Sequence, residues 1–161
     1  MESGNNVIIS GRNRDYKELS ESLRNKKVLL LTCNTCVRLC GEVGGRKSAD
    51  RLSDKLSKDN VDVIDVIDVS AACIASTVLK KLTPEKMDES DMILSLTCPL
   101  GAACVASVSG MDILNPVEMI GIGYLDEDGV PIVVSNSCDF TEETPAVEMA
   151  KDSGLKLTPF V

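Results

Sequence analysis

The amino-acid sequence predicts an α/β domain whose core is a mostly parallel open sheet, Rossmann-like or flavodoxin-like, with an antiparallel edge hairpin. Short, continuous apolar runs alternate with amphipathic segments, a pattern typical of parallel strands joined by helices. Near the C-terminal end, two β-branched segments flank the turn sequence Asp-Glu-Asp-Gly, which indicates a hairpin. With 161 residues, 43% of them hydrophobic, the chain is expected to form a single domain over residues 1–161.

The first half of the chain supplies two predicted helices and two predicted strands. Apolar residues spaced three and four apart predict an N-terminal helix within 13–26. The apolar run at 27–32 predicts a fully buried strand, and the amphipathic segment 46–58 predicts a helix. The segment 61–69 is rich in β-branched residues and predicts a strand, but its aspartates recur every three residues, which fits neither strand nor helix period.

The second half continues the alternation. It predicts, in order, a helix at 74–82, a strand at 91–97, a small-residue helix at 101–110, a hairpin from 118 to 137 and a helix at 143–152. The core of the domain is therefore expected to span about 27–138, and 139–161 to form a C-terminal helix and tail.

Composition excludes several classes of function. A net charge of −8 leaves no basic stripe for nucleic acid. No apolar stretch approaches the roughly 18 residues of a membrane span, and the first residues lack the pattern of a secretory signal, so we expect a cytoplasmic protein. The sequence contains no histidine, which excludes Cys/His zinc fingers and catalysis that depends on a histidine base.

Seven cysteines are the main chemical feature of the chain, and an odd number in a cytoplasmic protein argues against a disulfide framework. Cys33 ends the first predicted core strand, Cys98 ends the third, and Cys73 closely follows the second. Cys138 ends the second strand of the hairpin. Because parallel strands end at one edge of a sheet, where ligands bind in open α/β folds, these thiols are candidates for one shared site.

Cys36 and Cys40 follow Cys33 closely enough to join that site. The spacing Cys-x2-Cys-x3-Cys is similar to those that hold an iron–sulfur cube, completed by a remote fourth thiolate. We therefore predict a [4Fe–4S] site with Cys33, Cys36 and Cys40 as ligands and either Cys73 or Cys98 as the fourth. Zinc, which more often takes two Cys-x2-Cys pairs, is the alternative metal. Cys104 is expected to pack as a small apolar residue of its helix, and the role of Cys138 is left open.

The segment KVLLLTCNTCVRLCGEVGGRKSADRLSDKL resembles the opening of the small iron–sulfur subunit, or C-terminal accessory domain, of acetogen-type methylenetetrahydrofolate reductases, the MetV family. Cys73, Cys98 and Cys138 look similar to later cysteines of that family, so the resemblance covers roughly 27–138. The sequence departs from the family at three points. Asn34 and Pro99 each stand where the family has a glycine, and residues 139–161 contain none of the family's C-terminal cysteines.

The resemblance implies an accessory or electron-transfer subunit of a methylenetetrahydrofolate-reductase-like complex in anaerobic one-carbon metabolism, without substrate chemistry of its own. It implies docking against a flavin-containing TIM-barrel reductase or another redox subunit. Three alternatives stay open: a zinc-stabilised docking module without a redox role, a thiol–disulfide protein that uses Cys33 and Cys36, and a fold that keeps only a subunit contact.

Overall fold

The computed structural model describes residues 7–135 and 143–161. Its strands are β1 (Val7–Arg12), β2 (Lys27–Cys33), β3 (Asp62–Val69), β4 (Met92–Leu96), β5 (Ile113–Leu114), β6 (Val117–Leu125), β7 (Pro131–Ser135) and β8 (Thr144–Pro145). Its helices are α1 (Tyr16–Leu23), α2 (Cys36–Leu39), α3 (Arg46–Lys58), α4 (Ala75–Lys81), α5 (Pro84–Asp88), α6 (Pro99–Ser109) and α7 (Ala146–Ser153).

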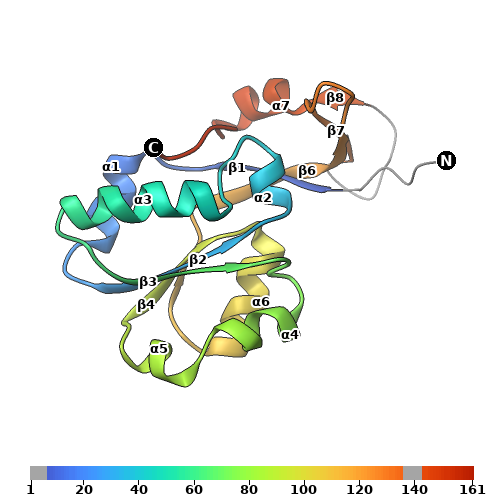
Figure 1. The fold of residues 1–161 in the computed structure, drawn as a ribbon. Helices are drawn as coiled ribbons and strands as arrows, with labels where there is room; N and C mark the ends of the chain where they lie inside the picture. The colour runs from blue at the N-terminus through green and yellow to red at the C-terminus, as the bar shows by residue number, and fades with distance from the viewer. Residues whose placement is uncertain (1–6, 136–142) are drawn as a thin grey trace.

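The strands form two sheets, one parallel and one antiparallel, so the chain is of the mixed α/β class. The parallel sheet has the order β3-β2-β4-β5, and the antiparallel sheet has the order β1-β6-β7-β8. Figure 1 shows the parallel sheet with α3 on one face and α4 and α6 on the other, while the antiparallel sheet and α7 lie beyond α2. The short helix α2 therefore lies where the two sheets meet.

The predicted position of the hairpin is wrong. The hairpin forms as β6 and β7, but it does not extend the parallel sheet, because β6 pairs with β1 instead. The edge beside β4 is taken by the two-residue strand β5. No strand is predicted at 7–12, although the Val-Ile-Ile run that opens this segment is a β signal. Because β1 pairs with β6, the hairpin belongs to the antiparallel sheet.

The elements that border the cysteines form where the sequence predicts them. Every residue of β2 after Lys27 is buried, as expected for a strand covered on both faces. Helix α3 spans the predicted segment and buries Ala49, Leu52 and Leu56 along one face. Helix α6 begins at Pro99, two residues earlier than predicted, and Cys98 is its N-cap residue. Among the described residues, no helix is long and apolar enough to cross a membrane.

The three-residue spacing of aspartates in β3 has a structural explanation. Residues an odd number apart in a strand point to opposite faces of the sheet. Asp65 pairs with Lys86 of α5 at 2.7 Å, whereas Asp68 pairs with Arg46 of α3 at 3.1 Å. Each carboxylate thus meets a cation from the helix layer on its own face.

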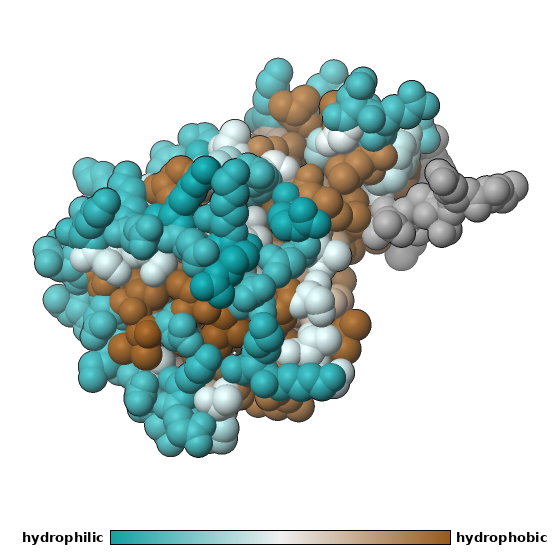
Figure 2. Space-filling view, in the orientation of Figure 1, coloured by the Kyte–Doolittle hydropathy of each residue, from teal (hydrophilic) through white to brown (hydrophobic). Residues whose placement is uncertain are grey.

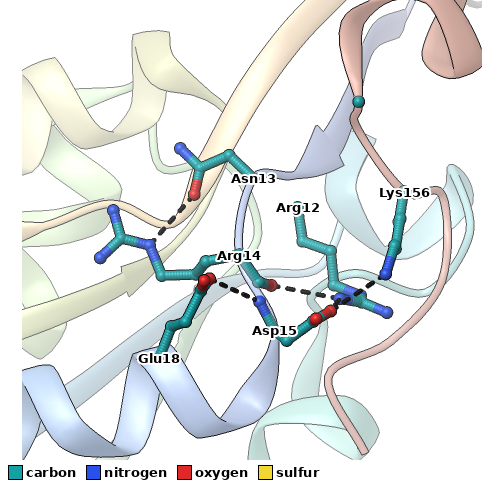
Figure 3. A pocket seen from close by; sticks show the side chains of 7 residues that line it. Arg12, Asn13, Arg14, Asp15, Glu18 and Lys156 are labelled. Atoms are coloured by element: carbon teal, nitrogen blue, oxygen red, sulfur yellow. Dashed lines mark hydrogen bonds and ion pairs between the residues drawn. The ribbon is translucent and has the colours of Figure 1, made fainter.

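The C-terminal tail packs across β1 and the turn after α2. The backbones of Arg12 and Lys156 exchange two hydrogen bonds, and both side chains donate to the Asp15 carboxylate, at 2.9 and 3.1 Å (Figure 3). A Cβ placed on Gly41 would lie 2.2 Å from the carbonyl oxygen of Leu157. The tail therefore leaves room only for glycine at this turn.

The hydroxyl of Thr32 joins the end of β2 to its surroundings, and its loss should destabilise the protein. This fully buried group donates to the Leu96 carbonyl at 3.0 Å and accepts from the Gly45 N–H at 2.8 Å. Thr32→Val should lower the free energy of unfolding by about 1–3 kcal/mol, because both partners would remain buried without a hydrogen bond. Urea denaturation measures the change. Thr83→Val is the matched control, since the Thr83 side chain makes no capping hydrogen bond. Equal stabilities of the two variants would contradict this account.

Candidate metal centre

Three cysteine-bearing loops meet at one edge of the parallel sheet. Cys33 is the last residue of β2, Cys98 follows β4 by two residues, and Cys73 lies in the loop after β3. Strands β3, β2 and β4 are neighbours and run in parallel, so their C-terminal ends share this edge. The chain moves from β2 to β3 on one side and returns to β4 on the other. Between β2 and β4 the strand order reverses, the position at which open α/β sheets form a ligand crevice.

Cys33 lies at the centre of this edge and is only 8% exposed. Its Sγ lies 3.2 Å from the Thr35 hydroxyl and 3.7 Å from the Ser70 carbonyl oxygen. The Thr35 hydroxyl also donates to the Ser70 carbonyl. The turn after β2 is thereby connected to the loop after β3, which carries Cys73.

Cys36 is the first residue of α2 and is half-buried. Burial raises the pKa of its thiol, while a hydrogen bond from the backbone of Ile8 opposes this change. Negative charge on Cys33 and on Cys73 raises the pKa of Cys36 further. Cys33 and Cys73 therefore both lie close enough to Cys36 for their charge to act on its thiol.

Cys98 joins this group from the far side of β2. Burial raises the pKa of its thiol, and the backbone N–H groups of Gly101 and Leu100 lower it. Charge on Cys36 and Cys33 raises the pKa of Cys98 as well. The sulfur thus faces two N–H groups in the first turn of an 11-residue helix, which offset part of the rise in pKa that burial causes.

Cys73 is the exposed member of the set. The loop that carries it is nevertheless well packed, because Ala72 is buried against the start of α6. A Cβ placed on Gly101 would lie 2.9 Å from the Cβ of Ala72. Glycine at this position lets the Cys73 loop approach the helix that Cys98 begins.

Cys40 has different surroundings. Cys40 is fully buried in a hydrophobic cluster that is separate from the main core around the parallel sheet. This second cluster includes Val7, Ile9 and Ile120. Burial raises the pKa of the Cys40 thiol to about 12, and Cys36 is the one thiol whose charge acts on it. Cys104 is partly buried on α6 against the main core. Cys138 lies outside the described residues.

Among the predicted ligands, Cys36 lies within range of the charges of Cys33 and Cys73, and Cys98 lies within range of those of Cys36 and Cys33. Cys33 and Cys98 are buried in the main core, and Cys40 is buried in a separate apolar cluster against which Cys36 packs. No group of three or more cysteines or carboxylates, within residues 7–135 and 143–161, is close enough to surround one metal ion. The four thiols of Cys33, Cys36, Cys73 and Cys98 thus lie along one edge of the sheet without surrounding one point.

Two asparagines that are not among the predicted site residues hold the strand ends in place. Asn115 donates from its Nδ2 to the carbonyl oxygens of Ser95 and Thr97, at 2.8 and 2.9 Å, immediately before Cys98. Asn34, inside the Cys-x2-Cys turn, bonds to β3 and α3. The position of Asn34 between two candidate ligands was the available signal. Nothing in the sequence around Asn115 indicated its role.

The order in which the thiols react should follow these environments. In metal-free, reduced protein at pH 8, iodoacetamide should modify Cys73 first, because it is exposed, and Cys40 last. Cys40 is buried, and its pKa near 12 leaves very little of the reactive thiolate. Timed quenching followed by peptide mass spectrometry gives the rate at each site. Modification of Cys40 before Cys73 in folded protein would contradict the burial described here.

Comparisons of the chain with models of protein families, with curated proteins and with solved structures give no match.

Proposed function

We propose that this protein is an iron–sulfur-binding accessory or electron-transfer subunit of a methylenetetrahydrofolate-reductase-like complex. One observation carries the proposal: cysteines at or just after the ends of three neighbouring parallel strands share one edge of the sheet, where its strand order reverses. A bound [4Fe–4S] cluster would supply one-electron transfer at this edge. The proposed ligands are Cys33, Cys36, Cys73 and Cys98.

The donor set fits such a cluster. The side chains that meet at this edge include four thiols, a ligand type that suits iron–sulfur clusters. The N–H groups at the start of α6 face Cys98, and they would stabilise the negative charge of a thiolate-ligated cluster. Both remote cysteines that the sequence offered as alternatives are included, and Cys40 is assigned to the hydrophobic core instead.

The spacing of the cysteines along the sequence favours a cluster over zinc, because zinc more often takes two Cys-x2-Cys pairs and this chain has one. A single zinc ion needs four donors at about 2.3 Å from one point. The described side chains contain no such group. A cube binds each cysteine through a different iron atom, so its ligands stand farther apart.

The strand order supports a flavodoxin-like rather than a Rossmann-like sheet. Numbered along the chain, the four parallel strands occur in the spatial order 2-1-3-4. This is the beginning of the flavodoxin-like order 2-1-3-4-5, whereas the Rossmann order places three successive strands on one side. In the flavodoxin-like order the crevice lies between the first and third strands, here β2 and β4.

The surface beside the thiols supports the proposal of a partner subunit. Ile74 just before α4, Leu79 on α4 and Leu100 on α6 are 50–56% exposed. The segments 69–79 and 92–111 contain no charged residue, in a chain that is 26% charged. Figure 2 shows apolar and weakly polar atoms over the α4 and α6 region. A flavin-containing TIM-barrel reductase or another redox subunit of the cytoplasm is the proposed partner.

The proposal is tested by anaerobic purification, reconstitution with ferrous iron and sulfide, and metal analysis. We expect about four iron atoms and about four labile sulfides per chain, with a visible absorption band that bleaches on reduction. A result of about one zinc ion and no labile sulfide per chain would contradict the cluster and support the zinc-stabilised docking module. A folded, colourless, metal-free protein that reduces disulfides would favour the Cys33/Cys36 redox function instead.

A further inference from the structure

Asn34 lies inside the turn from Cys33 to Cys36, and its backbone is bound at both polar atoms. Its N–H donates to the Val69 carbonyl at the end of β3, at 2.9 Å. Its carbonyl oxygen accepts from Nε of Arg38 at 2.7 Å. The turn is therefore attached both to the neighbouring strand and to the helix that follows it.

The side chain of Asn34 makes two further hydrogen bonds of opposite polarity. Its Nδ2 donates to Oδ2 of Asp68 at 2.8 Å, and its Oδ1 accepts from the backbone N–H of Arg46 at 2.9 Å. The Arg46 guanidinium also donates to Oδ1 of Asp68 at 3.1 Å. Asn34, Asp68 and Arg46 thus form a closed ring of hydrogen bonds that joins the cysteine turn to β3 and to the start of α3.

This ring depends on the side chain and not on an unusual backbone. The non-glycine residues with positive φ, among those described, are Asn25, Glu42 and Asn60, so Asn34 is not in the left-handed region that favours glycine. A glycine here would be sterically allowed, but it would leave the Asp68 carboxylate and the Arg46 N–H without their partner.

We infer that Asn34 is a positioning residue of the thiol site: its side chain holds Cys33 and Cys36 in the arrangement that binds a ligand before any metal arrives. This inference rests on the proposed function, because the ligand that Cys33 and Cys36 would bind is the proposed cluster. A turn that is already ordered loses less conformational entropy when a ligand binds. Loss of the ring should therefore lower the affinity for every ligand that needs both thiols.

The test uses phenylarsine oxide, which binds two neighbouring thiols at once, on the reduced, metal-free protein. Asn34→Asp replaces the donor toward Asp68 by a second carboxylate and should weaken arsenical binding about ten-fold. The double substitution N34D/D68N exchanges carboxylate and amide, which restores a donor–acceptor pair and keeps an oxygen for the Arg46 N–H. It should recover affinity to within about two-fold of the unmodified chain.

Asn13→Ala is the matched control, because the Asn13 side chain donates to Glu118 on the surface, and it should bind the arsenical normally. Thermal unfolding of each variant separates a changed turn from an unfolded protein. Unchanged affinity in N34D, or a double variant that binds no better than N34D, overturns the positioning role. Failure of the chain to take up iron would overturn the proposed function, while the arsenical measurement on metal-free protein would still decide the role of Asn34.

Discussion

Replacing Cys36 with alanine is expected to remove most of the bound iron, whereas replacing Cys40 with alanine is expected to leave the iron content unchanged. The two residues are one helical turn apart in the same motif. Cys36 is half-buried and interacts electrostatically with Cys33, Cys73 and Cys98. Cys40 is fully buried among apolar side chains, and Cys36 is the described thiol whose charge acts on it.

Iron and labile sulfide per chain, measured after identical anaerobic reconstitution, compare the two variants. C40A should instead lose about 1–2 kcal/mol of unfolding free energy, because a buried sulfur is replaced by a small cavity. Cys104→Ala is a further control for cysteine removal in general, since Cys104 lies on α6 against the main core. Loss of iron in C40A would contradict this assignment, and loss of iron in both variants would restore the Cys-x2-Cys-x3-Cys ligand set that the sequence predicts.

Replacing Gly41 with alanine is expected to destabilise the whole protein by about 3 kcal/mol or more. Two costs add at this position. Its φ of +71° is unfavourable for any residue with a Cβ, and the Cβ would lie 2.2 Å from the Leu157 carbonyl oxygen. The obstacle is backbone, so relief requires displacement of the C-terminal tail from the turn that follows Cys40.

Gly110→Ala separates the two costs. Gly110 has a similar φ of +65°, but no atom lies within 4 Å of the position of its Cβ. It should therefore lose only about 1 kcal/mol, from the backbone conformation alone. Chemical denaturation of both variants gives the difference, and equal losses would mean that the tail does not press on Gly41.

Local sequence signals were sufficient for the elements that carry the cysteines. The apolar run of β2 and the helical periodicity of α3 predicted both elements closely, because each is determined by side chains within its own segment. The location of Cys33 and Cys98 at strand ends follows from the same patterns. The common edge then follows from parallel pairing, which the alternation of strands and helices implies.

Local sequence signals did not show which distant segments pair with each other. The hairpin was recognisable from its turn, where the Asp126 carboxylate accepts from the N–H groups of Asp128 and Val130. The turn does not specify which strand lies beside β6. That choice depends on β1, more than a hundred residues away, so the hairpin was assigned to the wrong sheet.

The sequence by itself determined the chemistry available to this protein: an acidic α/β chain without histidine, with cysteines placed after the strands of a parallel sheet. Tertiary structure alone decided which of those cysteines lie at the sheet edge and which are buried in an apolar cluster. Packing of β1 and the C-terminal helix around α2 encloses Cys40 in a second apolar cluster, and the strand order brings Cys73 and Cys98 to the edge that holds Cys33. The physical reason is that spacing in sequence limits which thiols can meet, whereas burial and orientation arise from segments that are distant along the chain.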